Sequence, residues 1–301
     1  MRVTNKMMNN NLLMNLNRGL TRLERINNQL GTKKKINAPS DDPVKTELIL
    51  RTSTSIRQTE QYIRNIGSAV SWLDATDVVL QDVVSVIHRA KDLAVSGAST
   101  HLDDTARKAL ADEVAQLRDN LMQLANSTHG GRYLFARQHT DSPPFTTDPN
   151  STEPLPDVEY LEGKGDSNLS NLVQYEIGEG VTMEVSVDGD FFLGIFSALK
   201  TLHEDLTQSG RAPDDVLGDL DDALDGVLSI MSEIGGKQNR VDLAQERLQD
   251  LQLNLTKILS EEQDLDYAEA IMELKMEEFA YRTALAVGAR IIQPSLVDFL
   301  R

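Results

Sequence analysis

The stretch that decides the fold runs from residue 63 to residue 87 and reads IRNIGSAVSWLDATDVVLQDVVSVI. Its apolar residues recur in alternating steps of three and four, from Ile63 and Ile66 to Val84 and Ile87, with one polar residue, Asp77, on the same line. This spacing gathers the side chains on one face of a helix and is typical of helical bundles and coiled coils. The stretch therefore predicts a long helix whose apolar face is buried within the chain.

The same spacing returns toward both ends of the sequence. On the N-terminal side it runs from Leu13 to Leu30 and stops at Gly31, a residue that commonly ends helices. The turn-forming sequence PSDDP follows at residues 39–43, and it predicts that Asp42 caps the long helix with Pro43 at the first helical position. On the C-terminal side the spacing runs from Val241 to Leu265 and is followed by a terminal helix.

The middle of the chain changes character. A third helix with its apolar face between residues 110 and 124 is predicted to end at Gly130-Gly131. Residues 138–172 are rich in proline and glycine turns, so loops are expected there. Alternating apolar and polar residues at 173–177 and 181–187 then predict a β-hairpin.

Helical spacing resumes after the hairpin, at residues 196–206 and 216–234, and Gly235-Gly236 predicts a break before the last arm. The fold class expected is mainly α: a long antiparallel helical bundle or coiled coil formed by the N- and C-terminal arms, with a small β-containing inserted domain. Five segments are expected: an N-terminal assembly helix (1–40), the N-terminal arm of the helical core (41–137), a β-containing outer insertion (138–192), the C-terminal arm of the core (193–264) and a C-terminal assembly helix (265–301).

Composition and charge exclude several classes of function. The net charge is −17, and residues 141–230 carry all of that excess, which disfavours nucleic-acid binding. There is no cysteine, so disulfides and thiol chemistry are absent. The longest apolar runs are about half of what a membrane span needs, so no membrane insertion is expected. The N-terminus lacks the features of a secretory signal, so any export is expected to leave the start of the chain intact.

The sequence offers little catalytic chemistry. Phosphate-binding, dinucleotide-binding and hydrolase motifs are absent, and the five histidines are scattered. His101 with Asp103 and Asp104 is interpreted as a capped loop rather than a metal site. Asp188-Gly189-Asp190 lacks the rest of a calcium loop and is interpreted as a turn. No catalytic, cofactor-binding or metal-binding residue is therefore expected, and the chain is not expected to be an enzyme.

The two ends offer interaction surface instead. Amphipathic helices of this length are marginal in water when isolated, so both ends are expected to become ordered on a partner. Their apolar faces could pack within the chain or between chains, and the sequence alone leaves both open. The candidate packing residues are Leu13, Leu16, Leu20, Leu23, Leu30, Met272, Met276, Phe279, Leu285, Ile292, Leu296, Phe299 and Leu300.

Short motifs at both ends resemble the bacterial flagellin family. The sequence KINAPSDDP at residues 35–43 is similar to the family's N-terminal turn motif, with Asn37, Asp41, Asp42 and Pro43 at the matching positions. The stretches GRYLF (131–135), DYAEA (266–270) and QPSLVDFL (293–300) are similar to later parts of the family pattern. The resemblance covers residues 1–140 and 190–301. At Lys33 and Arg137 this sequence departs from the family, which commonly has glycine there.

The resemblance implies a structural protein of the bacterial flagellum, and the MRVTNKMM start and SLVDFL ending favour a hook–filament junction adaptor. Its implied location is extracellular, after export without a cleaved signal peptide, and its terminal helices fold as they pack into the assembly. The implied partners are hook-associated protein 1, flagellin, further copies of itself in a ring-like layer and an export chaperone. Two alternatives remain open: a filament flagellin, and a cytosolic coiled-coil adaptor.

Overall fold

The computed structural model describes residues 5–98, 103–147, 155–160, 172–207 and 214–292. These residues form two compact units. The terminal unit comprises the described residues up to Gln58 and those from Asp250 onward, and the central unit comprises those from Thr59 to Gln249. Two long helices contribute to both units, because each unit boundary falls inside one of them.

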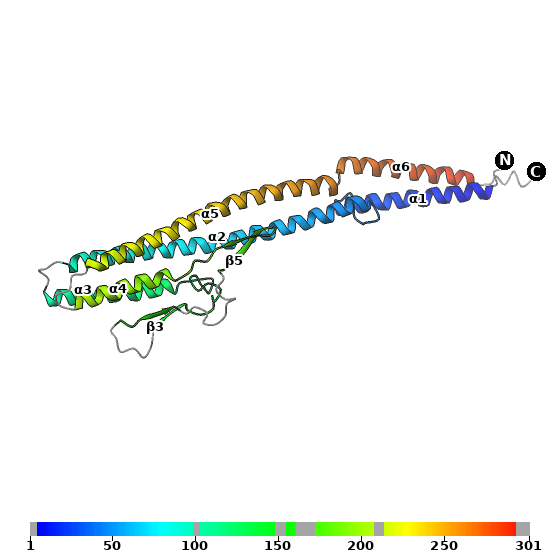
Figure 1. Ribbon diagram of the computed structural model, residues 1–301. Helices are drawn as coiled ribbons and strands as arrows, with labels where there is room; N and C mark the ends of the chain where they lie inside the picture. The colour runs from blue at the N-terminus through cyan, green and yellow to red at the C-terminus, as the bar shows by residue number, and fades with distance from the viewer. Residues whose placement is uncertain (1–4, 99–102, 148–154, 161–171, 208–213, 293–301) are drawn as a thin grey trace, which may run out of the picture. The chain divides into compact units, whose positions relative to one another are not determined.

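Six helices make up most of the described chain, as the fold class predicted (Figure 1). The terminal unit pairs the first helix with the last, and the central unit packs α3 along α4. The helices are α1 (Asn5–Thr32), α2 (Pro43–Gly97), α3 (Asp104–Ala125), α4 (Phe191–Thr207), α5 (Asp214–Gln263) and α6 (Tyr267–Ile292).

The strands are short and form three separate antiparallel pairs. The pair β5 (Gln174–Gly178) and β6 (Val181–Glu184) is the predicted hairpin, with Tyr175 opposite Met183. The other two pairs are β1 (Thr128–His129) with β2 (Arg132–Tyr133), and β3 (Phe145–Thr147) with β4 (Val158–Tyr160).

The core of the central unit confirms the helix predicted from residues 63–87. Ile66, Leu73, Leu80 and Ile87 are fully buried in one hydrophobic cluster with the apolar face of α5. That face is formed by Val216, Leu220, Val227, Ile234, Val241 and Leu248. The antiparallel pairing of the two arms therefore rests on matching apolar seams, as the spacing indicated.

Two predicted helix breaks are wrong. α5 continues through Gly235-Gly236, because the buried residues Ile234 and Val241 on either side outweigh a glycine cost of about 1 kcal/mol each. α3 ends at Ala125 with Asn126 as its C-cap, before Gly130-Gly131. Those two glycines have φ values of 58° and 80° and form the tight turn between β1 and β2.

Candidate assembly surface and turn motif

α1 and α6 pack along a line of small and apolar residues. On α1 the less exposed positions are Leu12, Leu16, Gly19, Leu23, Ile26 and Leu30, and on α6 they are Ala270, Leu274, Glu277, Tyr281, Ala284 and Gly288. Both series alternate steps of four and three, which is the spacing of a coiled-coil seam.

Two buried glycines lie on this line, and Gly288 allows the closest approach of the helices. A Cβ atom on Gly288 would lie 2.6 Å from Cδ2 of Leu12, and one on Gly19 would lie 3.5 Å from the ring of Tyr281. One turn beyond the Gly19–Tyr281 contact, the Arg22 guanidinium donates two hydrogen bonds to the Glu277 carboxylate, at 2.7 Å and 3.1 Å. This bidentate pair adds a polar contact between the two helices.

The predicted seam of α1 is divided between two faces of the helix. Leu16, Leu23 and Leu30 are half-buried on the face that packs on α6. Leu13 and Leu20 lie beside that face and are exposed, Leu13 by 56%. Ile26, which the prediction left out, is 1% exposed and the most buried of the α1 side chains whose burial the structure describes. Gly19, seven residues before Ile26, has no apolar side chain. A count of large apolar residues therefore favours Leu13 and Leu20 over the adjacent positions Leu12 and Gly19, which contact α6.

Three candidate residues of α6, Met272, Met276 and Phe279, lie on its outer side and are exposed, Phe279 by 74%. Leu285 is also exposed but lies beside the inward face, four residues after Tyr281. None of the four belongs to the inward series from Ala270 to Gly288. Ile292 belongs to the last turn of α6. Three more candidates lie outside the described residues: Leu296, Phe299 and Leu300.

The turn motif before α2 is built by two aspartates. The backbone N–H groups of Asn37 and Ala38 donate to Oδ2 of Asp41, at 3.1 Å and 3.0 Å. These bonds favour the ionised carboxylate, so they hold the pKa of Asp41 below its ordinary value.

Asp42 accepts from the backbone N–H groups of Val44 and Lys45, both at 3.1 Å. With Pro43 as the first residue of α2, the predicted cap is confirmed.

The break between α1 and α2 pairs with the break between α5 and α6. The N–H of Lys35 donates to the carbonyl of Gln263 at 2.7 Å, and the N–H of Leu265 donates to the carbonyl of Lys33 at 3.2 Å. Asp266 then starts α6, since its Oδ1 accepts from the N–H of Ala268 at 2.8 Å. Both breaks follow from local turn signals in the sequence, whereas their backbone pairing joins segments more than 200 residues apart and leaves no local pattern.

The Asp188-Gly189-Asp190 turn holds a side-chain cation. The guanidinium of Arg137 donates to the carboxylate of Asp188 and, at 3.4 Å, to Oδ2 of Asp190. The hydroxyl of Tyr160 donates to Oδ1 of Asp188 at 3.2 Å. Burial together with the Asp188 charge raises the pKa of Tyr160 well above its ordinary value. This cluster joins β4 to the loop before α4.

The described residues contain no group of three or more acidic, histidine or cysteine side chains placed to hold a metal ion. No helix in the same ranges is long and apolar enough to cross a membrane. Asp103 is the N-cap of α3, accepting from the N–H of Ala106 at 2.8 Å, as the capped-loop interpretation requires. His101 lies outside the described residues.

Comparison with known proteins identifies relatives at both ends of the chain. The family model for the bacterial flagellin N-terminal helical region matches residues 3–140, and that for the flagellin C-terminal helical region matches residues 217–300. Flagellar hook-associated protein 3 of Escherichia coli strain K12 is 25% identical over 274 residues, covering 85% of this chain and 86% of that protein. The protein of the same name from Salmonella typhimurium strain LT2 is 32% identical over 146 residues, covering 48% of this chain and 46% of that protein.

The fold also has a solved counterpart. The crystal structure of flagellar hook-associated protein 3 from Legionella pneumophila matches with a TM-score of 0.61 at 15% sequence identity. The match covers 71% of this chain and 98% of that one. At this identity the likeness establishes a shared fold.

Proposed function

Since the chain belongs to the bacterial flagellin family, we propose that it is the adaptor that joins the flagellar hook to the flagellin filament. It is a structural protein of the flagellum, related to hook-associated protein 3 over most of its length. Its proposed location is the hook–filament junction outside the cell, reached by export without a cleaved signal peptide. Its proposed neighbours are hook-associated protein 1, flagellin and further copies of itself, with an export chaperone before assembly. It has no proposed enzymatic activity.

The observation that carries the proposal is the apolar outer side of the paired terminal helices. α6 presents Met272, Met276 and Phe279 on its outer side, and α1 presents Leu13 and Leu20 beside the face that packs on α6. A row of large apolar side chains on one surface is unfavourable in water and typical of a surface that becomes buried on association. Packing of this surface against neighbouring subunits would couple the ordering of the terminal helices to assembly.

A deletion strain tests the junction role. Cells that lack the protein are expected to swim poorly, to carry no filaments and to release flagellin monomers into the medium. Loss of the major filament protein itself would instead identify the chain as the filament flagellin. Normal filaments and swimming would contradict both functions.

Point variants introduced into the same strain test the surface. Phe279→Asp with Met276→Asp places charge on the outer side of α6 without touching the contacts with α1, so export should persist while filaments are lost. Arg282→Gln changes the charge at an exposed position of the same helix that lies off the stripe, and it should support normal filaments. Filaments formed by the Phe279 and Met276 variant would exclude this surface from assembly.

A further inference from the structure

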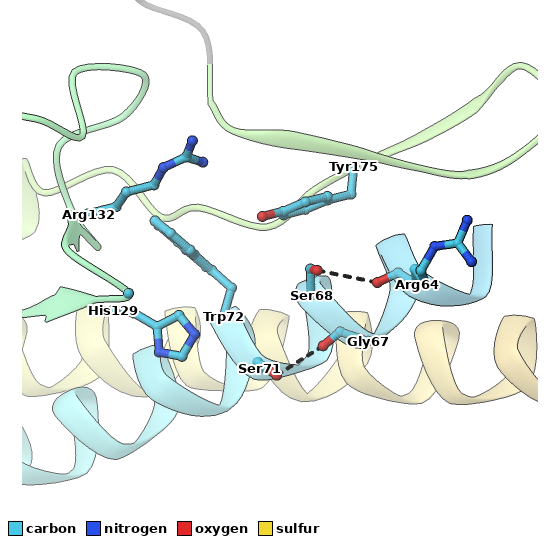
Figure 2. Close-up of a pocket in the computed structure, with 9 residues that line it drawn as sticks. Arg64, Gly67, Ser68, Ser71, Trp72, His129, Arg132 and Tyr175 are labelled. Carbon is cyan, nitrogen blue, oxygen red and sulfur yellow. Dashed lines mark hydrogen bonds between the residues drawn. The ribbon is translucent and has the colours of Figure 1, made fainter. Parts of the chain in front are cut away.

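The central unit has a hollow lined by aromatic and basic side chains. Trp72 rises from α2, Tyr175 extends toward it from β5, and His129 lies below on β1, with Arg64 and Arg132 on either side (Figure 2). The hollow has a volume of about 570 Å³. The rings of Trp72 and His129 meet edge to face at 6.1 Å between centroids. Trp, Tyr and Arg are the residues that contribute most of the binding energy at protein interfaces.

The charge of the hollow is not balanced within the described part of the chain. Arg64 donates to the side-chain carbonyl of Gln61 at 2.7 Å, and neither Arg64 nor Arg132 forms an ion pair among the described residues. The side chain of Trp72 is only 2% exposed, and its Nε1 has no hydrogen-bond acceptor among the described residues. The two guanidinium groups are donors that fit a carboxylate-bearing surface, whereas the buried indole belongs to the wall of the hollow.

Such a surface lies on α5 of the same chain. Asp219, Asp222 and Asp225 are exposed on the helix and form no ion pair among the residues described. Gly218 and Gly226 lie beside them, and a Cβ atom at either glycine would meet nothing within 4 Å. Interior glycines weaken a helix by about 1 kcal/mol each, and here they leave the backbone open to close approach. These three exposed aspartates, Asp219, Asp222 and Asp225, are called the acidic ridge. Asp219 and Asp222 also border a shallow hollow beside α4, so the complement to the aromatic hollow is one of charge.

The ridge cannot reach the hollow of its own molecule. Asp221, on the adjacent position of the ridge, forms an ion pair with Lys91 of α2. Along α2, Lys91 and Trp72 are separated by about 28 Å at 1.5 Å of rise per residue. The two surfaces can meet only between copies that are displaced by a similar distance along the helix. A contact between two different surfaces repeats from copy to copy and closes into a ring or continues as a helix.

We propose that the aromatic–arginine hollow of one copy receives the acidic ridge of a second copy in the flagellum. The inference rests on the proposed junction function and names the surfaces through which like subunits contact one another. Each subunit contributes its hollow to one neighbour and its ridge to the other.

Engineered disulfides test this contact in assembled flagella, because the chain has no cysteine of its own. The double variant Ser68→Cys with Gly226→Cys places one thiol in the hollow and one beside the ridge. The two positions are more than about 20 Å apart in one chain, too far for an internal disulfide. Mild oxidation of flagella from the complemented deletion strain should give a ladder of dimers, trimers and larger products. Each single-cysteine variant should give no product larger than a dimer.

Charge variants in the double-cysteine background separate this contact from chance collision. Arg64→Glu with Arg132→Glu should reduce the cross-linked fraction at least about tenfold, and adding Asp222→Arg with Asp225→Arg should restore it. Arg240→Glu with Arg247→Glu makes the same charge change on the other side of the hairpin and should leave the ladder intact. A strain that forms filaments but gives no ladder would overturn this contact and leave the junction function standing. Normal filaments in the deletion strain would overturn the junction function instead.

Discussion

Lys33 and Arg137 share a backbone conformation that other non-glycine residues in the described ranges do not adopt, with φ values of 64° and 49°. At both positions the resemblance to the flagellin family implies a glycine. For a residue with a Cβ atom the left-handed region costs about 1–2 kcal/mol. The two departures from the family pattern are therefore places where this chain carries backbone strain, and each can be relieved by one substitution.

Lys33→Gly is expected to stabilise the terminal unit. Glycine removes the left-handed penalty but loses more entropy on folding, so the net gain should be up to about 1 kcal/mol. Lys33→Ala removes the same charge while keeping the strain, and it should give no gain. Amide exchange at Lys35 and Leu265, whose N–H groups bond across this turn, measures the difference. Faster exchange in the glycine variant than in the alanine variant would show that the positive φ at residue 33 does not destabilise the turn.

Arg137 should behave differently, because its side chain offsets the strain of its backbone. The side chain of Arg137 is 18% exposed, and its guanidinium contacts both Asp188 and Asp190. Arg137→Ala loses these charged hydrogen bonds and keeps the strain, so it should cost about 2 kcal/mol of unfolding free energy. Arg137→Gly loses the same bonds but relieves the strain, and should be about 1 kcal/mol more stable than the alanine variant. Urea unfolding monitored by the fluorescence of Trp72 measures the unfolding free energy of both variants. Equal stability of the two would show that the backbone at residue 137 is not strained.

Gly189 is expected to tolerate no side chain. A Cβ atom there would lie 2.9 Å from Cζ of Phe145, 3.1 Å from the carbonyl oxygen of Phe135 and 3.1 Å from the ring of Tyr160. The aromatic rings are packed and the carbonyl is backbone, so Gly189→Ala should destabilise the central unit by about 1–3 kcal/mol. Gly194→Ala adds a Cβ that meets nothing within 4 Å inside α4 and should be neutral or slightly stabilising. Thermal unfolding should show a lower Tm than that of the unmodified chain for Gly189→Ala, and an equal or slightly higher Tm for Gly194→Ala.

The sequence predicted the central unit well because its helices bury large aliphatic residues. Ile66, Leu73 and Leu80 are visible in a count of apolar spacing, and their burial in one cluster with α5 follows from that spacing. The break predicted at Gly235-Gly236 failed because a glycine signal acts locally, whereas the packing of Ile234 and Val241 acts over the length of the helix. Tertiary burial outweighed the local preference.

The contact between α1 and α6 could not be derived from the sequence because it is made partly by small residues. Gly19 and Gly288 are buried, yet neither adds to a count of large apolar residues, so that count does not mark the face of α1 that contacts α6. The outward direction of Phe279 and Met276 could not be derived from sequence either, since both faces of α6 carry apolar residues. Only the position of its partner helix separates the inner face from the outer.

The turn before α2 should lose stability in acid through Asp41. Its carboxylate accepts from the N–H groups of Ala38 and Asn37, and these bonds hold its pKa below the ordinary value of 3.8. A carboxylate with a depressed pKa in the folded state contributes stability that is fully present above the unfolded pKa and is lost as the pH falls through the folded pKa. The contribution should therefore be complete at neutral pH, should begin to fall near the ordinary value of 3.8, and should be lost as the pH passes through the lower folded pKa.

Asp41→Asn tests this dependence, because the amide has nearly the same shape without the charge. At pH 7 the N–H groups of Asn37 and Ala38 should exchange faster in the variant than in the unmodified chain, since a neutral acceptor forms weaker hydrogen bonds. At a pH below the folded pKa of Asp41, where the carboxyl group of the unmodified chain is protonated, the two proteins should exchange at similar rates. Comparing both proteins at each pH cancels the intrinsic pH dependence of exchange, and Glu47→Gln controls for the loss of a nearby exposed charge. A difference between the two proteins that is independent of pH would show that the Asp41 charge does not hold the turn.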